Sequence, residues 1–150
     1  MMRQRPQARR GGALLEAAIT LPLLLLLLLA VIDYGRLIMT RDLMDNAARE
    51  GARLAVVSAG GSGASPTLTT AQIQSYTTGF LAGQGSGSPV VSIYQADPVT
   101  FQNTGVAWNA APYGGYIAVQ IQLTFQPISP LVIPQTMQLT AKSIMKSEAN

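Results

Sequence analysis

Cysteine and histidine are both absent from this chain of 150 residues. Without cysteine, the chain can form no disulfide framework and no lipidated cysteine anchor, and thiol chemistry is excluded. Without histidine, it lacks the commonest general base and metal ligand. Charged residues are also scarce, at 11% of the sequence. These absences argue against an enzyme, and we expect neither a metal ion nor a cofactor.

The few charged side chains of residues 54–150 offer little material for catalysis. They are Asp97, Lys142, Lys146 and Glu148. An acid-base pair would have to combine Asp97 with Glu148, and a nucleophile pair would combine Lys142 with Ser143. Lysines on the solvent-exposed face of a terminal strand more often prevent the edge of the sheet from pairing with another chain. If the protein were an enzyme, replacing Lys142 or Asp97 with Ala would abolish its function without changing its localisation.

The net charge of +3 is due to the N-terminal leader. Four of the ten basic residues lie there without any acidic residue: Arg3, Arg5, Arg9 and Arg10. Residues 12–150 contain six basic and seven acidic side chains, so their formal net charge is −1. Nucleic-acid binding requires basic residues clustered on a folded face, so we expect no nucleic-acid partner.

An apolar run of 20 residues, Ala13 to Ile32, follows the leader and contains seven consecutive leucines, Leu23 to Leu29. At about 1.5 Å per residue, a helix of this length crosses a hydrocarbon core of about 30 Å. A cleaved signal peptide shares this pattern, but branched Val31 lies where the small residues of a cleavage site would follow, so we expect the segment to be retained. The basic leader predicts a cytoplasmic N-terminus and a single-pass protein whose outer domain is periplasmic or extracellular.

Glu16 places a carboxylate one turn into the apolar run. A charged group at mid-bilayer costs about 2.5–3.5 kcal/mol, and less near the edge. In one interpretation Glu16 marks the membrane boundary and its side chain reaches back to the headgroups. In another, the chain is cut between Gly11 and Gly12, and Glu16 becomes the fifth residue of the mature protein. The new ammonium group of Gly12 then pairs with Glu16 of a neighbouring helix, and each charge offsets the desolvation of the other.

Three segments of the first 57 residues together resemble the TadE-like pseudopilins of tight-adherence pilus systems. They are Arg10 to Glu16 followed by Leu21-Pro22-Leu23, then Asp33-Tyr34-Gly35-Arg36, then Asn46 to Arg53. The resemblance implies cleavage by a prepilin peptidase after Gly11, with Gly12 at the new terminus and Glu16 as the fifth-position carboxylate. It also implies a minor component of pilus assembly in a bacterial inner membrane, whose partners are other pilins and the assembly platform.

Two departures leave alternatives open. Ala17 stands where related pilins often carry an aromatic residue, and a cut after Gly12 would make Glu16 the fourth residue. The alternative function is an uncleaved, single-pass, membrane-anchored binding or receptor module with a small extracytoplasmic domain. An intact leader on the native protein would indicate that alternative.

Helical spacing continues beyond the apolar run, so we predict one continuous helix from about Ala13 to Val57. One face carries apolar and small residues: Leu37, Met44, Ala47, Gly51 and Ala55. Arg41, Asp45 and Arg49 have i, i+4 spacing on another face. The small residues Ala47-Gly51-Ala55 and Ala48-Ala52 allow a close approach, for which the chain's own sheet is the expected neighbour. Pro22 cannot donate to the carbonyl of Ala18, so we expect a bend there.

A second helix is predicted between two Gly/Ser-rich linkers, Ser58–Pro66 and Gln84–Ser88. It begins at Thr69, where Thr69 and Gln72 fit a capping box, and ends at Gly83. One of its faces carries Ile73, Tyr76, Thr77, Phe80 and Leu81.

Three strands are predicted in the rest of the chain: Val90 to Ala96, Tyr116 to Gln126 and Met137 to Lys146. The second alternates strictly between apolar and mostly polar residues, so one face is buried. Pro127, Pro130 and Pro134 predict a stiff connection to the third. The expected fold is α+β, with a basic leader (1–11), a transmembrane helix extended beyond the membrane (12–57) and a pilin-like exported domain (58–150). That domain combines the second helix with an antiparallel sheet of about three strands.

Aromatic residues surround the pair Gly114-Gly115. Trp108, Tyr113 and Tyr116 form either an exposed contact patch or a cap over the core of the sheet. The sequence leaves these two interpretations open.

Overall fold

The computed structural model describes residues 9–59, 67–83, 88–129 and 135–147. The described residues form two α-helices, a short 3-10 helix and three strands. Their bounds are α1 (Arg9–Ser58), α2 (Thr70–Gly79), β1 (Val90–Ala96), η1 (Trp108–Ala110), β2 (Tyr116–Phe125) and β3 (Met137–Lys146). The α+β fold predicted from the sequence is confirmed, and β1 and β3 have the predicted bounds.

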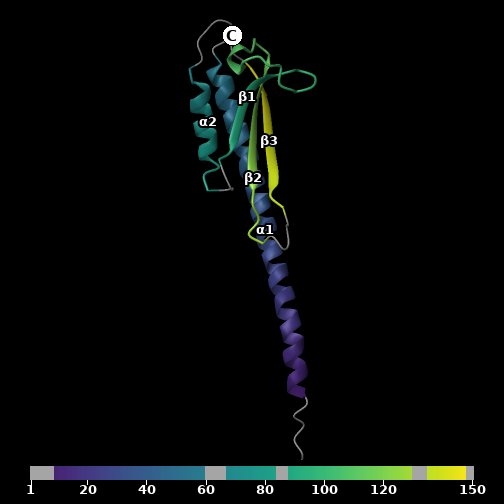
Figure 1. Ribbon diagram of the computed structural model, residues 1–150. Helices are drawn as coiled ribbons and strands as arrows, with labels where there is room; N and C mark the ends of the chain where they lie inside the picture. Colours follow the sequence, from purple (N-terminus) through teal and green to yellow (C-terminus); the bar gives the residue numbers. More distant parts are fainter. Residues whose placement is uncertain (1–8, 60–66, 84–87, 130–134, 148–150) are drawn as a thin grey trace, which may run out of the picture.

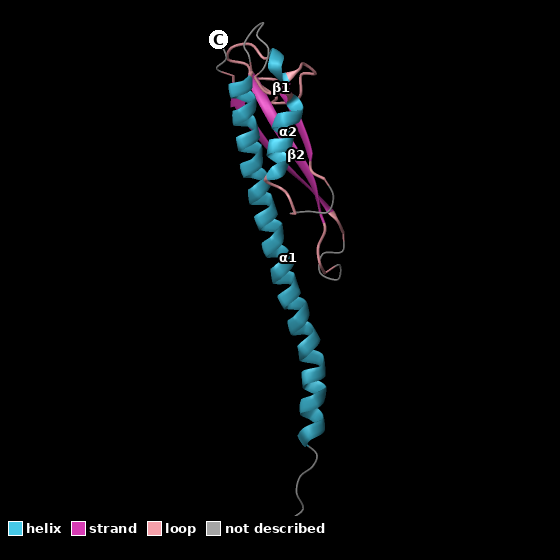
Figure 2. Ribbon diagram, turned by 90° about the vertical axis from the view of Figure 1, so that its left-hand side faces the viewer, coloured by secondary structure: helices cyan, strands magenta, loops and turns pink. Residues whose placement is uncertain are grey.

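The long helix α1 is the axis of the molecule. It starts four residues before the predicted Ala13 and continues without interruption through Pro22. Figures 1 and 2 show that its C-terminal half lies along the sheet, whereas its N-terminal half projects beyond the rest of the chain. The proline is therefore accommodated inside one helix, which Figure 2 shows curving gently rather than breaking.

The sheet has the order β1-β2-β3, and both strand pairs are antiparallel. One face of β2 carries a single buried apolar residue, Ala118, which clusters with Tyr94 and Ala96 of β1. On the other face the predicted alternation is confirmed, because Ile117, Val119, Ile121, Leu123 and Phe125 are all buried. All but Phe125 share one core with residues of α1 and α2, which places both helices on the same face of the sheet. The strand ends one residue before the predicted Gln126.

A tight turn leads the chain into β2. The amide of Gly115 donates to the carbonyl of Pro112 at 2.8 Å, and Gly114 has a positive φ of 77°, as the third residue of a type II turn requires. The amides of Gly114 and Ser147 then bond across to the carbonyls of Ser147 and Gly115. Two residues opposite one make a bulge that starts the pairing of β2 with β3.

Small residues of α1 allow the helix to lie close to the sheet. Ala47, Ala48, Ala52 and Ala55 are fully buried, and Gly51 is buried with them. A Cβ atom on Gly51 would lie 2.7 Å from Oγ1 of Thr77 in α2 and 3.2 Å from Cγ1 of Val119 in β2. The prediction that these residues pack against the chain's own sheet is confirmed, and α2 joins the same contact.

The helix α2 has the predicted capping box. The amide of Gln72 donates to the side chain of Thr69, and the amide of Thr69 donates to the side chain of Gln72. The helix ends at Gly79, four residues before the predicted Gly83. A further turn of chain leads to Gly83, which has a positive φ of 81°.

The predicted apolar face of α2 is only partly buried. Ile73, Thr77 and Leu81 lie in the core, whereas Tyr76 and Phe80 stay exposed and stack edge to face at 5.2 Å. Ile73, Thr77 and Leu81, at positions i, i+4 and i+8, face the sheet. The neighbouring row, which contains Tyr76 and Phe80, lies outside this contact. The helix therefore buries a narrower stripe than the sequence indicates.

Several predictions lie outside the described residues. They concern most of the leader (1–8), most of both Gly/Ser-rich linkers (60–66 and 84–87), Pro130 and Pro134 (130–134), and Glu148 (148–150).

Candidate functional site along the N-terminal helix

The candidate processing and docking residues lie on the projecting part of α1. Gly11, Gly12 and Glu16 are exposed, and a Cβ atom on either glycine would have no neighbour within 4 Å. The hydroxyl of Thr20 bonds the backbone carbonyl of Glu16, but no described residue pairs with the Glu16 carboxylate. The carboxylate is thus presented on the outside of the helix, where another molecule can reach it.

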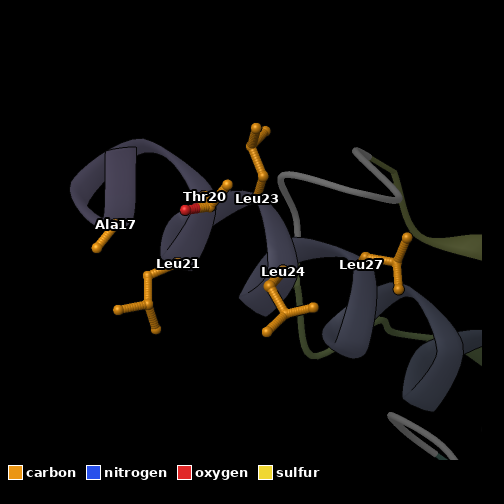
Figure 3. A pocket seen from close by; sticks show the side chains of 6 residues that line it. All are labelled: Ala17, Thr20, Leu21, Leu23, Leu24 and Leu27. Atoms are coloured by element: carbon orange, nitrogen blue, oxygen red, sulfur yellow. The ribbon is translucent and has the colours of Figure 1, made fainter. Parts of the chain in front are cut away.

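The apolar part of α1 is long and hydrophobic enough to cross a membrane, and none of its most apolar stretch is buried in the structure. An open hollow on its surface is lined by Ala17, Thr20, Leu21, Leu23, Leu24 and Leu27 (Figure 3). These side chains come from one helix and include a single hydroxyl, so the hollow fits a lipid chain or an adjacent helix better than a polar ligand.

Asp33 is a buried charged residue that the sequence analysis did not single out as a site. Its side chain is 1% exposed, and its two oxygens accept the amides of Ile128 at 2.9 Å and Ser129 at 2.8 Å. Arg36, one turn further along α1, lies 3.5 Å away and also stands 5.6 Å from the ring centre of Phe125. Asp33 therefore ties the segment after β2 to the helix.

Hydrogen bonding keeps Asp33 ionised. The bond from the Ile128 amide, with those from Ser129 and Arg36, lowers the pKa of Asp33 below its ordinary value of 3.8, against the opposing effect of burial. A lowered pKa means that the tie is complete at neutral pH and is lost only in acid, as the pH falls through the folded value. A usable sequence signal was the position of Asp33 as the first charged residue after the apolar run.

Replacing Asp33 with Ala should release the segment after β2. The amides of Ile128 and Ser129 would lose charge-assisted hydrogen bonds, so we expect their hydrogen exchange to quicken on the order of tenfold or more. Hydrogen exchange followed by mass spectrometry of the full chain in detergent measures this directly. Asp97→Ala is the matched control, because Asp97 also accepts two backbone amides, those of Val99 and Thr100, in a different loop. Equal protection of Ile128 and Ser129 in Asp33→Ala and in the unchanged chain would contradict the tie.

Glu148 lies outside the described residues, and the other residues considered for catalysis are each held in separate local contacts. Lys142 and Ser143 follow each other in β3, so their side chains leave opposite faces of the sheet. The ammonium group of Lys142 bonds the carbonyl of Phe101 and lies 5.4 Å from the ring centre of Tyr94. The bond from the Thr100 amide, with others in the same turn, lowers the pKa of Asp97. In the described part of the chain, no cluster of three or more Asp, Glu, His or Cys residues could hold a metal ion.

The aromatic residues near Gly114-Gly115 separate in the structure. Trp108 is buried in the main core, where its indole nitrogen donates to Oγ1 of Thr70 at 2.9 Å. Tyr113 is 70% exposed, whereas Tyr116 packs edge to face on Phe101 with a half-buried ring. They do not form one patch, and only Trp108 takes the predicted place in the main core.

The charged residues on the middle of α1 remain unpaired with each other. Arg41, Asp45 and Arg49 have the predicted spacing, but within the described ranges the ion pair that forms is Arg36 with Asp33. Arg41 and Arg49 are exposed. This spacing therefore contributes a charged outer face rather than an ion-pair ladder inside the molecule.

Most of the sequence of α1 matches a known protein family. Residues 11–53 match the family model of TadE-like proteins. The match confirms the resemblance over this TadE-like segment, which runs from the candidate cut to the first part of α1 packed on the sheet. No curated protein and no solved structure matches the chain. The TadE-like segment suggests a membrane-associated protein related to the Tad pilus.

Proposed function

We propose that the protein is a TadE-like minor pseudopilin that supports assembly of a tight-adherence pilus. The observation that carries this proposal is the TadE-like segment itself, residues 11–53, because its apolar half stands free of the folded domain. A helix that projects from its own domain is available to a membrane and to neighbouring subunits. The role is structural, without enzymatic activity and without a cofactor.

Processing is the first step of the proposed mechanism. A prepilin peptidase cuts between Gly11 and Gly12 on the cytoplasmic side of the inner membrane, which removes the basic leader. The exposure of both glycines supports access to this bond. The apolar run from Ala13 to Ile32 then retains the protein in the membrane with the sheet outside.

Docking is the second step. The new ammonium group of Gly12 meets the Glu16 carboxylate of an adjacent pilin helix, and each charge removes the desolvation cost of the other. The exposure of Glu16, and the lack of a partner for its carboxylate among the described residues, support this role. Other pilins and the assembly platform are the proposed partners.

The N-terminus of the native protein tests the proposal. Intact-mass measurement of protein extracted from its own membrane should show loss of residues 1–11, and N-terminal sequencing should begin at Gly12. A terminus at Ala13 would move the cut by one residue and make Glu16 the fourth residue. An intact arginine-rich leader on the membrane protein would instead favour the uncleaved receptor module.

A further inference from the structure

The segment that follows β2 lies at the membrane-side end of the domain. Figures 1 and 2 place the end of β2 level with the middle of α1, below α2 and far from the C-terminus. The two hydrogen bonds to Asp33 fix Ile128 and Ser129 next to the residue that directly follows the apolar run. Among the described residues of the domain, this segment is therefore held next to the end of the apolar run of α1.

Apolar side chains are exposed at this end. Ile128 is 61% exposed, and Met137, which is paired with Phe125 at the start of β3, is 41% exposed. Tyr34, next to Asp33 on α1, is also 61% exposed. Isolated exposed apolar residues are ordinary on a protein surface, but these lie beside the end of a membrane span.

The backbone of this segment is prepared for a poorly hydrated environment. Pro127 has no amide hydrogen, and the amides of Ile128 and Ser129 are both bonded to Asp33. The charge of the carboxylate is stabilised by these amides and balanced by Arg36. Unsatisfied backbone donors and acceptors both exclude loops from apolar surroundings, and these three consecutive residues present no unsatisfied donor.

We propose that the turn at Pro127 and Ile128 is a second membrane contact, in which the Ile128 side chain inserts into the interfacial layer of the bilayer crossed by α1. That layer extends about 5–8 Å beyond the hydrocarbon on each side. Asp33 sets the height of the contact because it belongs to the first turn of α1 outside the apolar run. Tyr34 and the half-exposed Arg36 are residue types that favour the same layer.

The contact would orient the domain. A sheet joined to the membrane only by a helix could lean in any direction, whereas a second contact selects the direction in which the end of β2 faces the lipid. The proposal rests on membrane anchoring by α1 and does not depend on cleavage or on a pilus. A failure of the pilus assignment would therefore leave it intact, and the reverse also holds.

The absence of cysteine makes the test direct. Single-cysteine variants Ile128→Cys and Val99→Cys, each in the full chain, are labelled with an environment-sensitive fluorophore and reconstituted in vesicles of phosphatidylethanolamine and phosphatidylglycerol. Val99 is 82% exposed in the loop after β1, at the opposite end of the sheet, and is the matched control. We expect headgroup-proximal doxyl lipids to quench the label at 128 severalfold more than the label at 99, with the opposite order for aqueous iodide.

Three results would overturn the proposal. The first is equal iodide quenching at both positions, which would place Ile128 in water. The second is a blue-shifted label at 128 that doxyl lipids do not quench, because another protein surface would then cover it. The third concerns Asp33→Ala in the Ile128→Cys chain, where lipid quenching should fall while a label at Leu25→Cys stays quenched. Unchanged quenching at 128 would contradict the proposal that Asp33 holds this contact at the bilayer.

Discussion

Glu16→Gln should leave the protein in the membrane and abolish its support of fibre assembly. Glutamine keeps the size and the hydrogen-bonding atoms of the side chain but removes its charge, so insertion into hydrocarbon becomes easier. The ammonium group of an incoming subunit would then lose its counter-charge in a water-poor environment. Removing one partner of a buried ion pair weakens association by about a hundredfold or more.

Membrane content and piliation have to be measured separately for this variant. Immunoblots of the membrane fraction report insertion, and electron microscopy with quantification of sheared fibres reports assembly. Asp42→Asn is the control, because it makes the same change of charge at an exposed position of α1 outside the apolar run. Normal fibre numbers with Glu16→Gln would remove electrostatic docking and favour the interpretation of Glu16 as a boundary residue.

Gly51→Ala should destabilise the domain by about 1–3 kcal/mol, the usual cost of overpacking a core. The new methyl group would lie 2.7 Å from Oγ1 of Thr77 and 3.2 Å from Cγ1 of Val119. Thr77 cannot rotate away without cost, because its buried hydroxyl donates to the carbonyl of Ile73 at 2.7 Å. The helices α1 and α2 would have to separate to admit one carbon atom.

The tryptophan of the chain provides the measurement. Trp108 is the single tryptophan and is 4% exposed in the core, so its fluorescence reports denaturant unfolding of the domain in detergent-solubilised full chain. Gly35→Ala is the control, since Gly35 belongs to the same helix and a Cβ atom there has no neighbour within 4 Å. That variant should match or exceed the unchanged chain, because alanine favours helix over glycine by about 0.5–1 kcal/mol.

A second substitution shows whether the steric contact is the cause. Adding Thr77→Ala to Gly51→Ala removes the nearest atom and should restore part of the lost stability relative to the sum of the two single changes. Strict additivity of the two changes would indicate that Gly51 acts through backbone flexibility instead.

Local patterns allowed most of the fold to be predicted. The strict alternation along Tyr116 to Phe125 is a property of neighbouring residues, and a strand places neighbours on opposite faces whatever surrounds it. The capping box of Thr69 and Gln72 is equally local, since both hydrogen bonds close within four residues. The end of α2 was less predictable, because the extra turn before Gly83 depends on how Leu81 packs into the core.

The residues of the candidate site also divide into those that local sequence predicted and one that only the structure identified. Gly11, Gly12 and Glu16 belong to a short segment whose order alone carries the resemblance to TadE-like proteins, and α1 presents them without help from the rest of the chain. In the sequence, Asp33 could be noted only as part of the segment Asp33-Tyr34-Gly35-Arg36. Its partners lie 95 and 96 residues away, and no local pattern announces a contact over that separation.

The sequence by itself thus determined the apolar run, the helix that continues from it, the three strands and the TadE-like segment, because each depends on spacing within a few residues. Tertiary structure alone decided that Gly51 must be small, that Trp108 is buried while Tyr113 is exposed, and that Asp33 holds the segment after β2 beside the end of the apolar run. Those outcomes depend on which surfaces meet when the sheet closes on α1, and the free energy of such contacts belongs to residues far apart in the chain.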